Sequence, residues 1–233
     1  MSFQNQAAIS IPETDPSPET DHSAISVRAV RWHQHVLRRA FEIPLALCAL
    51  VFGLPLMLAV AVWIRSGTPG PVLFWQDRVG RGGRTFRFVK FRTMYTDAKD
   101  RFPDLYCYSY PSGSDFKFKI VNDPRVTPQG EILRKLTLDE LPNFWNVLTG
   151  DMALIGPRPE VPGMLKNYSP SAMRKFSVRP GVSGLAQIRG RGDLSFADTI
   201  RYDLEYVDRY TVLLDVRIFF ATVNAVILRR GAF

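Results

Sequence analysis

Cysteine and histidine are scarce in this chain of 233 residues, which holds two cysteines and three histidines. Cys48 lies in an apolar run and Cys107 in a loop rich in proline, serine and tyrosine, so the two form no plausible disulfide. This usage fits a reducing cytosol better than secretion. The histidines, at positions 22, 33 and 35, lie far in sequence from the loops considered below. The sequence therefore gives no support to a cysteine–histidine metal centre or to a serine–histidine–aspartate hydrolase.

Residues 1–27 lack lysine and arginine but carry four acids. All 30 basic residues therefore lie beyond residue 27, where they face 18 of the 22 acids. A basic surplus of this size implies an anionic partner, such as nucleic acid, an acidic bilayer face or a phosphorylated substrate. The first 27 residues are rich in proline, serine, threonine and glutamate, and we expect a disordered acidic tail there rather than a cleaved signal peptide.

Charge is absent from one long run, Ile43 to Ile64, whose 22 residues are enough to span a bilayer. Basic residues flank the run on both sides, so the positive-inside rule gives no orientation. Pro55 interrupts the middle, where it removes a backbone donor and clashes with the preceding turn. The two limbs would be about 18 and 15 Å long, roughly one leaflet each. We therefore predict a helix–break–helix segment over 28–66 that enters and leaves by the same membrane face, with a kinked single-pass span as the alternative.

The remainder of the chain, 67–233, predicts an α+β fold that is mostly helical with a small β-hairpin. Residues 71–76 and 85–91 read as two strands, joined by the turn Gly80-Arg81-Gly82-Gly83. We expect the last two helices to be amphipathic and interfacial, with the final one either packed on the core or lying in the bilayer interface. Helices are expected over 129–136, 137–150, 169–176, 195–210 and 213–228.

Two adjacent carboxylates, Asp139-Glu140, stand at the start of one expected helix. Free N–H groups and the helix dipole hold a carboxylate ionised at this place. It is then available as a Mg²⁺ ligand or as a nucleophile towards phosphorus. The alternative is ordinary helix capping, by Asp139 or by Thr137 before it.

Basic side chains flank the pair in sequence and favour phosphate as its target. Arg134 precedes it by five residues, and Arg158 follows between Pro157 and Pro159, which restrict its backbone. Lys90, at the end of a strand, is a further candidate phosphate ligand, although each of these cations is also explained as a solvated surface charge. The segment from Arg179 to Gln187 reads as a glycine-containing loop whose N–H groups could wrap a nucleotide, and a plain loop is the alternative.

These segments together resemble the bacterial sugar transferase family, the monotopic polyprenyl-phosphate phosphoglycosyl transferases. The resemblance covers about residues 38–230. The matching stretches are Phe41-Glu42 with the Pro55 break, Gly70 to Gln76, Lys90 to Met94, Asn122 to Thr127, Leu133 to Lys135, Leu138 to Pro142, Asn146 to Met152, Gly156 to Pro159 and Arg179 to Gln187. The chain departs from the family pattern at Leu54, Asn143, Ala153, Pro128-Gln129 and Glu131, none of which is a proposed catalytic group.

The resemblance implies a two-step transfer. Asp139 would attack the β-phosphate of a UDP-sugar and release UMP, and undecaprenyl phosphate would then take the sugar phosphate. Glu140 would bind Mg²⁺. Contacts with phosphate or nucleotide are implied for Lys90, Arg134, Pro157, Arg158 and Gln187.

The family also implies a catalytic domain over 67–233 at the cytoplasmic face of the inner membrane, held there by a monotopic anchor and an anionic lipid bilayer. We expect UDP-galactose or UDP-glucose as the donor, and the synthesis of an exopolysaccharide or another surface glycan as the purpose. The oligomeric state stays open, with a homodimer among the alternatives. The minimal catalytic unit of the family is expected, because only a short tail precedes it.

A rival interpretation is a membrane-anchored scaffold without catalysis, whose basic surface binds anionic lipid. Nucleic-acid binding is disfavoured, because the arginines are not interleaved with aromatic residues on a recognisable platform.

Overall fold

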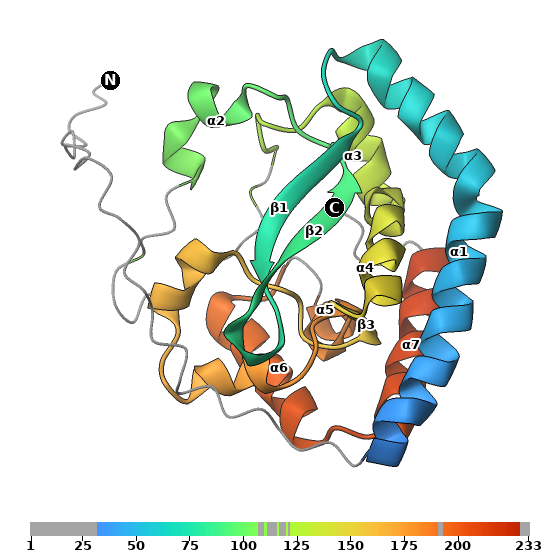
Figure 1. Cartoon of the computed structure of the whole chain (residues 1–233). Coiled ribbons are helices and arrows are strands. Elements are labelled where there is room, and N and C mark those ends of the chain that lie inside the picture. Colours follow the sequence, from blue (N-terminus) through green and yellow to red (C-terminus); the bar gives the residue numbers. More distant parts are fainter. Residues whose placement is uncertain are drawn as a thin grey trace.

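The computed structural model describes residues 32–106, 110, 116, 120, 122–190 and 193–228. The acidic tail predicted over 1–27 and Cys107 lie outside these residues. The described part is mostly helical with a small antiparallel hairpin, as the sequence predicted (Figure 1).

The apolar run forms one continuous helix, α1 (Trp32–Gly67), with Pro44 and Pro55 inside it. The predicted break at Pro55 is therefore wrong at the level of secondary structure, although α1 changes direction near its middle (Figure 1). A proline costs the helix one hydrogen bond and bends it, and the leucine, alanine and methionine around Pro55 are good helix formers that carry the helix past the bend. The re-entrant path stays a prediction.

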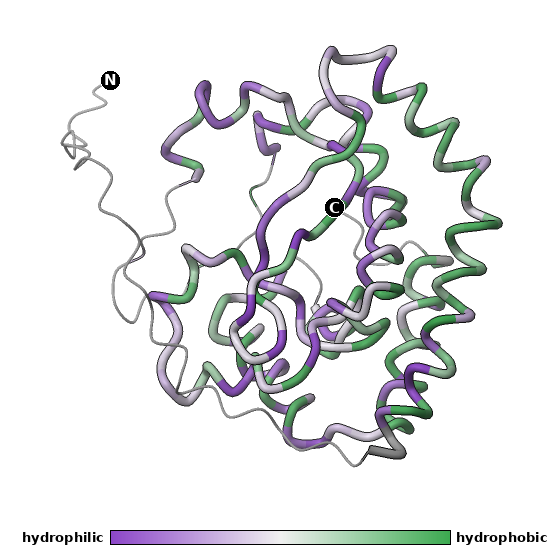
Figure 2. Tube along the Cα trace, in the orientation of Figure 1, coloured by the Kyte–Doolittle hydropathy of each residue, from purple (hydrophilic) through white to green (hydrophobic). Residues whose placement is uncertain are grey.

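Much of α1 is hydrophobic (Figure 2), and many of its apolar side chains are exposed. The stretch His35–Gly67 is long and apolar enough to cross a membrane, and only 11% of its most apolar window is buried within the fold. Beside the first half of α1 lies α7 (Val212–Ile227), where the rings of Phe41 and Phe219 meet edge to face at 6.2 Å. The exposed apolar side chains of the two helices are Val36, Leu37, Phe41, Ile43, Leu47, Val51, Phe52, Leu54, Leu56, Leu58, Val62 and Trp63 of α1 and Leu213, Val216, Phe220, Val223 and Val226 of α7.

Charged side chains attach the first third of α1 to the rest of the fold. Arg39 donates to the carbonyl oxygens of Val147 and Leu148, at 2.7 and 3.1 Å. These carbonyls belong to α4 (Phe144–Thr149), whose C-terminal end carries partial negative charge. Glu42, which is buried, accepts the backbone N–H of Leu154 at 3.3 Å. The apolar helix is thus fixed to α4 and to the backbone at Leu154, which follow the carboxylate pair in the chain.

The hairpin is confirmed as β1 (Leu73–Val79) and β2 (Thr85–Phe91), paired antiparallel around a short 3-10 turn, η2 (Arg81–Gly83). A second sheet was not predicted: β3 (Ala153–Ile155) pairs in parallel with β4 (Gly181–Ser183). The expected loop from Arg179 to Gln187 is therefore a strand followed by the short helix α5 (Leu185–Gly190). A Cβ on Gly181 would lie 2.1 Å from the backbone nitrogen of Gly156, so this close pairing needs glycine.

The other helices follow the expected order. The helix expected over 129–136 is α3 (Pro128–Lys135), and it is capped by Thr127, whose hydroxyl accepts the N–H of Gly130 at 3.0 Å. Helix α6 (Phe196–Asp208) belongs to the core, because its Tyr206 is 1% exposed. Helix α7 shares that core through Ile218, while its interfacial position stays a prediction. The remaining elements are α2 (Ala98–Arg101), η3 (Pro103–Tyr106), η4 (Leu138–Asn143), η5 (Pro162–Asn167) and η6 (Ala172–Ser177).

Candidate active site

The carboxylate pair lies inside a 3-10 helix, not at a helix cap. The single helix expected over 137–150 is in fact η4 followed by α4. Thr137 precedes η4 in the left-handed conformation, with φ 59°, and its side chain makes no capping hydrogen bond. Asp139 is the second residue of η4 and does not cap it. The capping interpretation of the pair is therefore wrong, and both carboxylates need another explanation.

The two carboxylates have different surroundings. Asp139 is 7% exposed, and no hydrogen bond or ion pair to it is found in the described part of the chain. The Glu140 side chain is 14% exposed and accepts a hydrogen bond from Nη2 of Arg158 at 2.7 Å. The side chain of Arg158 remains 44% exposed, so this ion pair faces solvent on one side. The pair thus presents one ion-paired acid and one buried acid.

Lys90 reaches the pair because β2 runs beside η4 and α4. Asn146 of α4 donates to the carbonyl oxygen of Arg87 at 2.8 Å and accepts the N–H of Val89 at 3.2 Å. These two bonds hold the edge of β2 against the helices, and they place Lys90 near Asp139. Arg134 of α3 is oriented by its Nε, which donates to the hydroxyl of Thr93 at 3.1 Å.

The electrostatics of the pair reflect burial and this ring of cations. Burial is the main cause that raises the pKa of Asp139 to about 6, and the charge of Glu140 adds to it. Lys90, Arg134 and Arg158 act in the opposite direction. Although burial alone would raise the pKa of Glu140, the charge and hydrogen bond of Arg158 lower it.

The surroundings of Lys90 disfavour the charged form of its side chain. Burial lowers the pKa of its ammonium group to about 8, in spite of the nearby Asp139. The neighbouring guanidinium groups of Arg134, Arg78 and Arg158 lower it further. Four cations therefore surround two carboxylates, and an anion such as a diphosphate would relieve this excess of positive charge.

The pair also fits a magnesium ion. No group of three or more histidine, cysteine, aspartate or glutamate side chains that could form a full metal cage exists among the described residues. Mg²⁺ does not need one, because it is commonly bound by one or two carboxylates together with waters and substrate phosphates. The buried Asp139 and the half-buried Glu140 are two such carboxylates.

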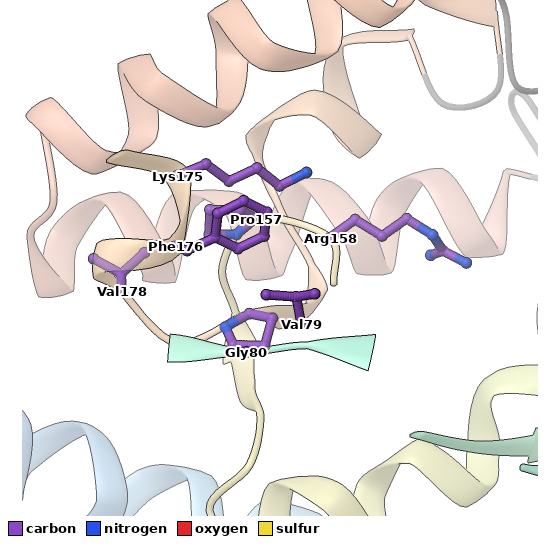
Figure 3. A pocket seen from close by; sticks show the side chains of 8 residues that line it. Val79, Gly80, Pro157, Arg158, Lys175, Phe176 and Val178 are labelled. Carbon is purple, nitrogen blue, oxygen red and sulfur yellow. The ribbon is translucent and has the colours of Figure 1, made fainter. Parts of the chain in front are cut away.

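The other predicted residues lie around or away from this centre. Pro157 lines a small cavity with Val79 and Gly80 at the end of β1 and with Lys175, while Arg158 extends away from these side chains (Figure 3). Gln187 lies in α5 against Gly184, and no hydrogen bond or ion pair within the described residues joins it to the carboxylates. Pro55 lies in the interior of α1.

Arg78 is a site residue that the sequence did not single out. Its charge acts on both Glu140 and Lys90, and its Nη1 donates to the carbonyl oxygen of Pro159 at 3.1 Å. Side chains alternate between the two faces of a strand, and Arg78 lies on the face of the hairpin that carries Lys90. This alternation along β1 could have identified Arg78 from the sequence.

Comparison with known proteins identifies the relatives of this chain. The profile of the family described as "Bacterial sugar transferase" matches residues 33–229. The exopolysaccharide production protein ExoY of Sinorhizobium fredii is 38% identical over 208 residues, which are 88% of this chain and 92% of that protein.

Two further relatives are longer. The undecaprenyl-phosphate galactose phosphotransferase of Salmonella typhimurium is 36% identical over 84% of this chain and 42% of its own length. The UDP-N-acetylgalactosamine-undecaprenyl-phosphate N-acetylgalactosaminephosphotransferase of Aeromonas hydrophila is 40% identical over 84% of this chain and 45% of its own. The chain thus spans less than half the length of these two.

Proposed function

Because this chain belongs to the bacterial sugar transferase family, we propose that it transfers a hexose 1-phosphate from a UDP-sugar to undecaprenyl phosphate. The observation that carries the proposal is the buried Asp139 beside Glu140, with Lys90, Arg134 and Arg158 around them. The names of the two longer relatives support an undecaprenyl-phosphate acceptor. Because these relatives are named for different sugars, belonging to the family does not determine which sugar this chain transfers. Galactose or glucose stays our expectation.

Transfer proceeds in two displacements at one phosphorus atom. An oxygen of the Asp139 carboxylate attacks the β-phosphorus of the UDP-sugar, and the bond from this phosphorus to the bridging oxygen breaks. UMP leaves with the electron pair, and the sugar phosphate is held as an acyl phosphate on Asp139. An oxygen of undecaprenyl phosphate then attacks the same phosphorus and frees the carboxylate. Both steps need an ionised Asp139 held against a phosphate.

The surrounding residues bind and orient the reactants. Arg158 and Arg134 are fixed by hydrogen bonds to Glu140 and Thr93, so their guanidinium groups meet the diphosphate in set positions. Lys90 contributes a point charge next to Asp139. Glu140, with Asp139 nearby, would hold Mg²⁺, which when bound neutralises charge on the phosphate oxygens.

The apolar surface of α1 and α7 supports a place at the inner membrane. A lipid-linked acceptor is confined to the bilayer, so a site fixed to α1 by Arg39 and Glu42 would meet it at the cytoplasmic face. Sugar transfer to this carrier would begin the synthesis of an exopolysaccharide or another surface glycan.

A panel of UDP-sugars tests the proposal. The full-length protein in detergent should release UMP from at least one UDP-sugar when undecaprenyl phosphate and Mg²⁺ are present. Without the acceptor, intact-mass spectrometry should show the protein heavier by one phospho-sugar. A catalytically inert scaffold would give neither UMP nor an adduct with any donor.

Glu140→Gln is expected to raise the Mg²⁺ concentration needed for half-maximal UMP release by about 10- to 100-fold, because a neutral amide is a weaker magnesium ligand. The variant keeps the shape of the side chain and its ability to accept from Arg158. Asp77→Asn, an exposed acid on the hairpin, is the matched control and should leave the titration unchanged. An unaltered magnesium titration in Glu140→Gln would contradict the assigned role.

A further inference from the structure

A buried side-chain amide joins the strand that carries Lys90 to the helix that follows the carboxylate pair. Asn146, in α4, is 2% exposed. Its Nδ2 donates to the carbonyl oxygen of Arg87 at 2.8 Å, and its Oδ1 accepts the N–H of Val89 at 3.2 Å. A neighbouring strand would bond to these two backbone groups in the same way. The amide therefore takes the place of a strand at the edge of β2 that faces away from β1.

The backbone of Asn146 is fixed as well. Its carbonyl oxygen accepts the N–H of Met152 at 3.0 Å and the hydroxyl of Thr149 at 3.1 Å. The amide thus projects from a part of the helix that is tied to the residues after it. Strand β2 cannot move away from α4 at this point without breaking the bonds of the amide to Arg87 and Val89.

Contacts just beyond Lys90 set the same strand against the carboxylate pair. Phe91, the next residue, belongs to a buried cluster against which Leu138 and Leu141 pack. These two leucines lie in η4, one directly before the two acids and the other directly after them. Strand β2 and η4 therefore meet where the strand carries Lys90 and where the helix carries the pair.

Arg134, the other cation beside this strand, has an anchor of its own. Its Nε donates to the hydroxyl of Thr93 at 3.1 Å, three residues beyond Lys90. The strand is thus held at two points, and Lys90 directly follows the first of them. Loss of the Asn146 amide would release the strand beside Lys90 and leave Arg134 bonded to Thr93. A displacement of about 1 Å is enough to cost roughly 100-fold in rate.

We propose that Asn146 is a positioning residue for sugar-phosphate transfer, whose amide holds β2 against α4 and so keeps Lys90 beside Asp139. This inference rests on the proposed function. Asn146 is buried and needs no contact with the substrate. It acts through Lys90, whose ammonium group meets the phosphate as a point charge. Loss of the amide therefore lowers the rate only as far as Lys90 contributes to it.

A double-mutant cycle in steady-state UMP release is the test, because it separates positioning from simple support of the fold. Asn146→Ala removes both bonds to β2 and should lower kcat/KM for the best UDP-sugar of the panel by about 10- to 100-fold. In a Lys90→Ala background, the same substitution should lower kcat/KM by less than about threefold. A residue that only supports the fold would lower the rate by the same factor in both backgrounds.

Thr149→Ala is the matched control. It removes the hydroxyl that donates to the carbonyl oxygen of Asn146, so it changes the same helix at the same residue without touching β2. Its kcat/KM should stay within about twofold of the wild type. All rates are compared at a temperature below the unfolding midpoint of every variant, in the full-length protein in detergent.

Equal factors in the two backgrounds would overturn the proposal, and so would an Asn146→Ala variant whose kcat/KM lies within about twofold of the wild type. If Asn146→Ala does not fold, Asn146→Gln takes its place in the cycle, because it keeps the donor and the acceptor but displaces them by one methylene group. If neither variant folds, the residue is structural and the proposal is rejected. Failure of the proposed function is distinguishable, since the wild type and Thr149→Ala would then release no UMP.

Discussion

Asp139→Asn is expected to abolish UMP release from the UDP-sugar. The rate should fall by about 10⁴-fold or more, as it does when the nucleophile is removed from other enzymes in which several catalytic groups act together. An amide has the same shape as the carboxylate but lacks its negative charge, so its oxygen is a far weaker nucleophile towards phosphorus. The phospho-sugar adduct should disappear from the intact mass at the same time. Both readouts depend on the first displacement, so they must fail together.

Binding and folding should survive this substitution. The pKa of Asp139 is raised to about 6, chiefly by burial, so the fold disfavours the ionised form that catalysis needs. A neutral amide removes this penalty, and Asp139→Asn should unfold at the same temperature as the wild type or a higher one at pH 7. Affinity for UMP, measured by calorimetry, should stay within a few-fold. Full activity, with Asp77→Asn as the surface control, would reject the assignment of Asp139.

The parts of the fold with strong local signals could be predicted from the sequence. The hairpin follows from alternating strands around Gly80-Arg81-Gly82-Gly83, and α3 lies within one residue of the helix expected over 129–136. The carboxylate pair and its cations were identified as candidates because acids and arginines occur close together in sequence. The hairpin, α3 and the adjacent acids with Arg134 are each decided within a short stretch of sequence, whereas Lys90 and Arg158 lie outside such a stretch and their choice is supported by the family motifs.

Features that depend on distant contacts could not be predicted. Strands β3 and β4 have three residues each, too few for a period-two pattern, and they form because Gly156 and Gly181 allow their backbones to meet. The 3-10 helix η4 packs against β2 and α3, contacts that lie outside the segment from which its helix was predicted. Arg78 belongs to the site only because β1 pairs with β2 and faces Pro159.

A buried charge cluster behind Arg158 is another feature that only the tertiary structure shows. Lys175 is 2% exposed, and its Nζ lies 3.0 Å from a carboxylate oxygen of Asp203 and 3.7 Å from one of Glu160. The hydroxyl of Tyr168 donates to Glu160 at 2.9 Å and lies 3.0 Å from Nζ of Lys175. Although burial alone would lower the pKa of Lys175, Tyr168 and the two acids raise it. The cluster draws together η6, α6 and the segment after Pro159.

Lys175→Met should therefore destabilise the protein strongly, by about 3–5 kcal/mol, since it leaves two buried carboxylates without a counter-ion. For a chain of this size the midpoint temperature of unfolding should fall by roughly 10 °C. Lys135→Met is the matched control, because Lys135 and Glu131 form an exposed pair worth only a few tenths of a kcal/mol. The thermal scan uses the full chain in detergent.

A second substitution distinguishes the contribution of the Lys175 charge to stability from that of its side-chain packing. Asp203→Asn in the Lys175→Met background removes one uncompensated charge and should recover part of the lost stability, although it adds no new contact. In the single variant Lys175→Met, Asp203 is still present. Burial already raises its pKa, and loss of the lysine raises that pKa further, so the folded single variant binds protons more tightly than the unfolded chain. The loss of stability in Lys175→Met relative to the wild type should then shrink as pH falls and grow as pH rises. A deficit that is the same in the single and double variants, and independent of pH, would mean that Lys175 contributes packing alone. A recovery on charge removal would show that the segment carrying Arg158 rests on a neutralised ionic core.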